Sequence, residues 1–147
     1  MFKTPTSLSL DTRKAVISAL DDVLQDGLAL QLLLYFAHWN VKGFAFAALH
    51  PFFGTLSDSI EGYNDRIAER IVILGGTAKV KTAPISHGSD QTEKALVKIV
   101  STGVQEYLEC LETARGAVKD DEDTEQILID GVLDWTKYGW QLLATLE

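Results

Sequence analysis

The chain has 147 residues, a length typical of one domain with a substantial hydrophobic core. Apolar residues make up 46% and charged residues 23%, the balance of a soluble globular protein, which excludes an extensively disordered chain. The net charge of −8 argues against a general nucleic-acid-binding surface, because phosphate binding needs clustered lysine and arginine. The same charge suits a protein that attracts cations.

The sequence also indicates the compartment. No apolar run of the signal-peptide type follows Met1, and no run of about 18 apolar residues predicts a membrane span. Cys110 is the one cysteine, so an internal disulfide is excluded and we expect a protein of the reducing cytoplasm. Cys110 lies beside Leu108 and Leu111, and we expect it to be a small buried hydrophobic residue rather than a reactive thiol.

Apolar residues recur at helical spacing in four segments. The first covers residues 10–40 and follows Ser9, a suitable N-cap. The second covers residues 46–74, and Gly75 and Gly76 predict its end. The fourth follows an acidic turn, with Asp123 as the predicted N-cap, and reaches residue 146. The third covers residues 92–118 and carries one apolar stripe, formed by Leu96, Val100, Val104, Tyr107, Leu111 and Ala114.

The connections between these segments predict the fold class. Residues 77–91 have no sustained period and contain Pro84 and Gly88, so the longest connection joins the second and third helices. This pattern predicts an all-α, ferritin-like four-helix bundle with a crossover connection, formed by a single domain over residues 1–147. Between Leu28 and Phe36 apolar residues surround the first helix almost completely, so we expect a second apolar face and association with another copy.

Two histidines flank the connection between the first and second helices. His38 continues a stripe of the first helix that is expected to face inward or into an interface, and it begins the sequence HWNVKG. His50 belongs to the start of the second helix, because Pro51 follows it and would break a helix interior. A single histidine beside a tryptophan is more often a hydrogen-bonded core residue than a metal ligand.

The second helix has one apolar and one polar face. Asp65 and Glu69 lie four positions apart on the polar face, which in most proteins is simply solvated. Together, two imidazoles and two carboxylates form a ligand set suited to Fe(II) or Zn(II). The polar face comprises His50, Gly54, Asp58, Glu61, Asp65 and Glu69, and the apolar face comprises Phe53, Leu56, Ile60, Tyr63, Ile67 and Ile71.

Helix geometry places a constraint on these ligands. His50 and Asp65 are 15 positions apart, hence roughly 22 Å along the helix axis, and cannot bind one ion within one chain. They lie within roughly 60° of each other around the helix, so they share a face. A second copy packed antiparallel about a two-fold axis would bring its own Asp65 and Glu69 opposite His50, and would create two equivalent sites.

The segment from His38 to Gly76 resembles the Dps family, the mini-ferritins also called DNA-binding proteins from starved cells. It contains His-Trp-Asn, a second histidine twelve residues after the first, and Asp-x-x-x-Glu-Arg fifteen residues after that. The helical layout extends the resemblance over nearly the whole chain. The resemblance implies a ferroxidase centre between two-fold-related subunits, in which one subunit supplies His38 and His50 and the other supplies Asp65 and Glu69 as catalytic metal ligands.

Members of this family are similar in forming a hollow shell of twelve subunits that oxidises Fe(II), usually with hydrogen peroxide, and stores ferric mineral. The resemblance therefore implies iron as the metal, peroxide or oxygen as the oxidant, and protection against oxidative stress as the role. The ligand set also suits Zn(II), which we expect as a competing ion. One alternative is a DNA-coating nucleoid protein with little ferroxidase activity, and another is an inert shell that binds Zn(II) or nothing. We expect weak DNA binding, because the N-terminal region offers only Lys3, Arg13 and Lys14 and the final residues LATLE are not basic.

Other positions match the family or depart from it. Trp39 and Trp140 match aromatic residues near the family's centre, with ordinary core packing as the alternative. Many members carry an acidic residue at the position of Gly54, which leaves occupancy of a second iron site open. The connector over residues 77–91 looks shorter than usual and is expected to lack the small helix of relatives. A run resembling the lining of the family's three-fold ion pores, or else a solvated loop, comprises Asp120, Asp121, Glu122 and Asp123.

Overall fold

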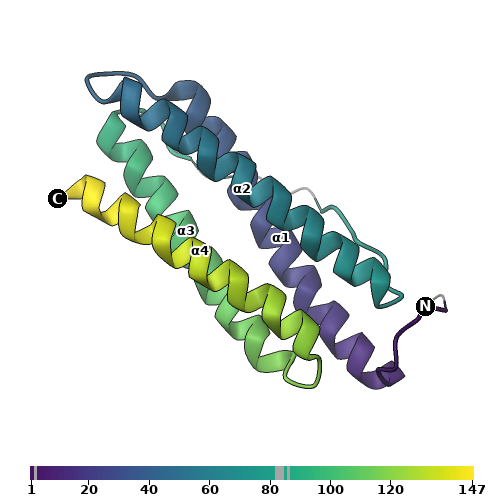
Figure 1. Ribbon diagram of the computed structural model, residues 1–147. Coiled ribbons are helices and arrows are strands. Elements are labelled where there is room, and N and C mark those ends of the chain that lie inside the picture. Colours follow the sequence, from purple (N-terminus) through teal and green to yellow (C-terminus); the bar gives the residue numbers. More distant parts are fainter. Residues whose placement is uncertain (2, 82–84, 86) are drawn as a thin grey trace.

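The computed structural model describes residues 1, 3–81, 85 and 87–147, and these form a bundle of four long helices (Figure 1). The four helices confirm the four predicted segments, and the described residues include no strand. The helices are α1 (Leu10–Asn40), α2 (Phe46–Ile73), α3 (Glu93–Ala117) and α4 (Glu122–Leu146).

The chain path contains the predicted crossover. Helices α1 and α2 are antiparallel and joined by the short loop of residues 41–45. The connector then returns along the length of the bundle, so that α3 begins beside the start of α2, and α4 runs back antiparallel to α3 (Figure 1). The described parts of the connector, residues 77–81, 85 and 87–91, contain no helix.

Local signals fix the helix ends. Ser9 is the N-cap of α1, and its hydroxyl accepts a hydrogen bond from the Thr12 N–H at 3.1 Å. After α2, Gly75 has a φ of +89°, a conformation that favours glycine. The Gly76 N–H donates to the Ile71 carbonyl at 2.9 Å, which satisfies one of the last carbonyls of α2. These glycines end the helix where the sequence predicts.

The core lies along the helix faces that the sequence predicts to be apolar. All members of the apolar face of α2 and of the α3 stripe are buried. Trp135 of α4 is 1% exposed and meets the Tyr107 ring edge-on, with a centroid distance of 5.7 Å. Cys110 is half-buried and not fully buried as predicted, but burial, aided by the nearby Asp26, raises the pKa of its thiol to about 12, which disfavours the reactive thiolate.

The length and apolar character of a helix decide whether it could cross a membrane. Within residues 1, 3–81, 85 and 87–147, no helix combines enough length with enough apolar character to cross a bilayer.

Candidate metal centre

The turn between α1 and α2 brings His38 and His50 together. His38 lies in the last turn of α1 and His50 is the fifth residue of α2. Their rings stack with a centroid distance of 3.9 Å and an interplanar angle of 21°. The Nδ1–H of His38 donates to the backbone carbonyl of His50 at 2.7 Å, and the Nδ1–H of His50 donates to the carbonyl of His38 at 2.8 Å. The two side chains therefore hold each other in place.

These reciprocal hydrogen bonds determine the tautomer of both rings. A carbonyl oxygen can only accept, so each Nδ1 carries a proton, and in the neutral imidazole each Nε2 is left with a free lone pair. This is the arrangement in which metal-binding histidines are held, with one ring nitrogen bonded to a backbone carbonyl and the other available to the metal. The His38 carbonyl lies in the last turn of α1, where carbonyls have no helical partner, so the bond from His50 also completes the helix end.

Gly54 makes room for the His38 ring. A Cβ atom at Gly54 would lie 3.2 Å from Cε1 and 3.3 Å from Nδ1 of that ring, closer than ordinary contact. Glycine therefore fits at this position, which contributes no carboxylate. The candidate ligands that remain are the two imidazoles and the carboxylates farther along α2.

Replacing Gly54 by Ala is expected to separate stability from metal binding. Alanine favours the helix by about 0.5–1 kcal/mol, which offsets the disturbed contact with the His38 ring, so the unfolding midpoint should change little. The added methyl displaces the His38 ring, so Zn(II) affinity of the assembled protein should fall by about tenfold, the scale of a disturbed outer-shell contact. Gly116→Ala is the matched control, because a Cβ there meets nothing within 4 Å. Equal Zn(II) affinities in competition titrations of the two variants would contradict this role for Gly54.

Asp65 and Glu69 lie on α2 beyond the histidines and are exposed. They share the polar face with His50, but 15 positions of helix separate Asp65 from His50, roughly 22 Å along the axis. Among the described residues, no three His, Cys, Asp or Glu side chains of one chain are grouped so that they could hold a metal ion. One chain therefore brings together two of the four predicted ligands and leaves the other two apart from them.

The two tryptophans that match family aromatics are on the surface. Trp39 is 72% exposed and stacks on Tyr35 at 5.5 Å, and Trp140 is 65% exposed. The alternative of ordinary core packing is therefore wrong for both within a single chain. The buried tryptophan is Trp135, and Leu32, one helical turn before Tyr35, is 52% exposed. The exposed apolar side chains of α1 form the second apolar face that the sequence predicts.

The acidic turn before α4 differs from the prediction in one respect. The N-cap is Asp121 and not Asp123, and its carboxylate accepts from the Thr124 N–H at 3.2 Å. Asp121 is also only 3% exposed, so it is not part of a solvated loop. The guanidinium of Arg70, on α2, donates to both carboxylate oxygens at 2.8 and 2.9 Å. Because Arg70 is 51 positions away, no local signal in the sequence reveals this pairing.

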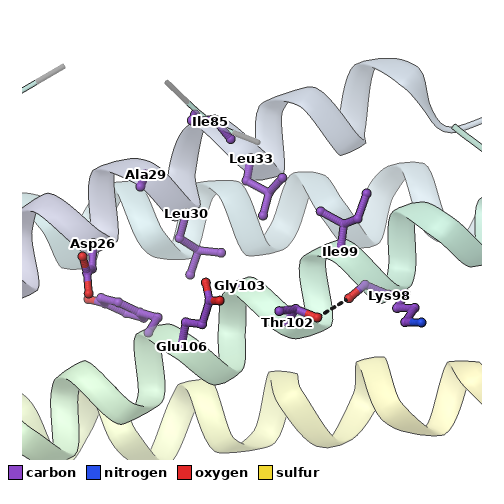
Figure 2. A pocket seen from close by; sticks show the side chains of 11 residues that line it. Asp26, Ala29, Leu30, Leu33, Ile85, Lys98, Ile99, Thr102, Gly103 and Glu106 are labelled. Atoms are coloured by element: carbon purple, nitrogen blue, oxygen red, sulfur yellow. Dashed lines mark hydrogen bonds between the residues drawn. The ribbon is translucent and has the colours of Figure 1, made fainter. Parts of the chain in front are cut away.

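A cleft between α1 and α3 lies outside the predicted site. Leu30, Leu33 and Ile99 give it an apolar wall, with Asp26 at one end, Lys98 at the other and Glu106 between them (Figure 2). It contains none of the four predicted ligands. This cleft therefore does not coincide with the candidate metal centre, whose two histidines lie near the α1–α2 turn.

Comparisons with known proteins identify the family. The ferritin-like domain model matches residues 17–147, so the chain belongs to the ferritin-like class. A DNA protection during starvation protein from Brevibacillus brevis is 31% identical over 129 residues, covering 80% of this chain and 85% of that protein. The Mycobacterium smegmatis Dps structure superimposes with a TM-score of 0.92 at 24% identity, covering 100% of this chain and 94% of that chain.

A Dps protein from Vibrio cholerae is described as a member of a broad superfamily of ferritin-like diiron-carboxylate proteins. It superimposes with a TM-score of 0.86 at 19% identity, covering 99% of this chain and 100% of that chain. Within the ferritin-like class, the 147-residue chain belongs to the Dps family.

Proposed function

We propose that this protein oxidises Fe(II) at sites shared between two-fold-related copies and stores the ferric product inside a hollow shell. We propose that the shell has twelve subunits. The observation that carries the proposal is the histidine pair, in which reciprocal bonds to backbone carbonyls leave both Nε2 atoms free to bind a metal. Membership of the ferritin-like family supports the choice of iron. The diiron-carboxylate description of the Vibrio cholerae relative agrees with it.

A shared site explains why the ligands of one chain are divided. An antiparallel copy packed on α2 would place its Asp65 and Glu69 opposite His50, and two-fold symmetry would repeat the site at the other end. The exposed apolar face of α1, which includes Leu32 and Trp39, supplies surface that such a pair can bury. We propose that His38 and His50 of one subunit act with Asp65 and Glu69 of the other.

The ligand set fits Fe(II) as the substrate. Neutral imidazoles suit Fe(II), and two carboxylates offset the greater charge of Fe(III) as it forms. Hydrogen peroxide takes one electron from each of two Fe(II) ions and, with two protons, gives two waters and two Fe(III) ions. Zn(II) prefers the same ligands and should compete for the site. Because Gly54 brings no carboxylate, a second iron ion would have fewer protein ligands than the first.

Anaerobic loading with Fe(II) tests the proposal. Addition of peroxide should give rapid ferric absorbance, air a slower rise, and Zn(II) should inhibit both. Sedimentation of the same sample should show a closed assembly whose mass increases with the iron added. A stable monomer at micromolar concentration, or ferric formation no faster than in protein-free buffer, would contradict the proposal.

We propose the cytoplasm as the compartment. The one cysteine, Cys110, is a free thiol, which fits a reducing compartment.

DNA coating is the second candidate, favoured by the name of the Brevibacillus brevis relative, a DNA protection during starvation protein. The net charge of −8 opposes it, because the surface repels phosphate. We expect no mobility shift of duplex DNA at neutral pH and physiological salt, and at most a weak shift in low salt with magnesium. A robust shift that persists at high salt would favour DNA coating instead.

A further inference from the structure

The loop of residues 41–45 joins the two histidines, yet the helix that follows it has no capping side chain of its own. Helices α1, α3 and α4 begin at Ser9, Thr92 and Asp121, whose side-chain oxygens accept backbone N–H groups. The N-cap of α2 is Ala45, whose methyl group cannot accept a hydrogen bond. Local carbonyls accept from some of the first amides of α2, with Phe46 N–H bonded to the Gly43 carbonyl at 3.2 Å and Ala48 N–H to the Ala45 carbonyl at 3.0 Å. The N–H of Ala45 itself is bonded by a side chain from another helix.

The partner of the Ala45 N–H is Glu93, the first residue of α3. Its Oε1 accepts a hydrogen bond from the Ala45 N–H at 2.5 Å, across 48 positions of sequence. The carboxylate also lies directly over Gly43, where an added Cβ would come within 2.5 Å of Oε1. Gly43 has a φ of +121°, so both the backbone and the close approach of Glu93 require glycine there.

One carboxylate thus joins two helix starts. Glu93 lies in the first turn of α3 and binds the N-cap amide of α2, and negative charge is favourable at both positive helix ends. His50 follows Ala45 by five residues, and its ring bonds the last turn of α1 through the His38 carbonyl. The position of the Glu93 oxygen therefore influences how the first turn of α2 meets the end of α1.

We propose that Glu93 is a positioning residue for the histidine pair, holding the α1–α2 loop so that both Nδ1–H groups reach their carbonyls and both Nε2 atoms stay free. The role of the two rings in binding metal rests on the proposed function. The effect of Glu93 on the two rings does not, because it concerns the metal-free chain. Glu93 reaches the α1–α2 loop because α3 begins beside the start of α2. The orientation of the two histidine rings therefore depends on the crossover topology.

Two conservative variants separate reach from charge. Glu93→Asp keeps the negative charge in the first turn of α3 but withdraws the oxygen by one methylene. Glu93→Gln keeps an acceptor at the same reach and loses the charge. Glu109→Ala is the control, because Glu109 is exposed on α3 and its carboxylate accepts a hydrogen bond from Gln105 of the same helix. All three variants should fold, because Asp and Gln are tolerated in the first turn of a helix and Ala is favourable at an exposed helix position.

The primary readout is the ¹⁵N shift of the ring nitrogens in metal-free, histidine-labelled protein, with His87 as internal reference. Wild type, Glu93→Gln and Glu109→Ala should show His38 and His50 protonated at Nδ1 alone. Glu93→Asp should show mixed tautomers and about tenfold weaker Zn(II) binding. Wild-type shifts in Glu93→Asp, or equal disturbance in the Asp and Gln variants, would overturn the inference. Neither result depends on whether the wild type oxidises iron, so the two proposals can fail separately.

Discussion

Replacing Asp65 by Asn and Glu69 by Gln in the same chain is expected to abolish rapid Fe(II) oxidation while the shell stays assembled. The change removes two anionic ligands from each proposed site and keeps the volumes of both side chains. Both residues are exposed in the single chain, so folding should change by about 0.5 kcal/mol or less. The initial rate should fall by more than the roughly 10–100-fold that loss of an outer-shell partner costs.

Stopped-flow absorbance after anaerobic loading measures the rate, and sedimentation of the same sample reports the assembly. Glu106→Gln with Glu109→Gln is the matched control, because it also neutralises two exposed carboxylates on one helix but lies outside the proposed site. The control should oxidise Fe(II) at the wild-type rate. Wild-type initial rates in the Asp65 and Glu69 variant would remove both residues from the site.

The largest effect on stability is expected from Asp121→Ala. The Arg70 side chain is 14% exposed and its bonding partner Asp121 is 3% exposed, so the substitution leaves a nearly buried guanidinium without its carboxylate. Breaking such a pair costs about 3–5 kcal/mol, and loss of the α4 N-cap adds about 1 kcal/mol. Denaturant unfolding should show the loss as a lower midpoint.

Asp123→Ala provides the comparison for this prediction. Its side chain is 87% exposed and lies 3.9 Å from the same guanidinium, so its removal should cost less than about 1 kcal/mol. Equal midpoints for the two variants would show that the buried pair does not hold the start of α4 against α2.

The same pair should make stability depend on pH. Burial raises the pKa of the Asp121 carboxyl, but hydrogen bonds from Thr124 and Arg70 outweigh it, so the pKa lies below its ordinary value. A carboxyl with a lowered folded pKa stabilises the protein above its unfolded pKa, and this contribution is lost as pH falls through the folded pKa. Acid titration of unfolding stability should therefore be shallower in Asp121→Asn than in wild type below about pH 4.

The helices could be predicted from sequence because their signals are local. Ser9, and Gly75 with Gly76, act through neighbouring amides and backbone conformation, and the apolar period needs no knowledge of the partner helix. The N-cap of α4 was different. Asp121 and Asp123 are equally good caps by residue type, and the choice depends on Arg70, which the fold brings from α2.

The candidate site was predictable in part for the same reason. The spacing from His38 to His50 matches a helix end and a helix start, so the short loop alone brings the rings together. The sequence cannot show that Glu93 caps α2, because that contact depends on the path of the crossover connector. Trp39 illustrates a further limit: it adjoins the half-buried His38, yet one residue turns its side chain by about 100° and onto the surface.

Mixing two inactive variants tests the shared site most directly. One variant has His38 and His50 replaced by Ala, and the other has Asp65 and Glu69 replaced by Asn and Gln. In a mixed two-fold pair, the histidines of the second variant face the carboxylates of the first, so one of the two sites is intact and the other lacks every ligand. Random co-assembly makes about half of all pairs mixed, so about a quarter of all sites should be restored.

The measurement is the Fe(II) oxidation rate after the two variants are unfolded together and reassembled, with native mass spectrometry to verify mixed assemblies. A shared site predicts recovery to about a quarter of the wild-type rate, against no activity in either variant reassembled alone. Verified mixed assemblies that oxidise Fe(II) no faster than the separate variants would contradict the shared site.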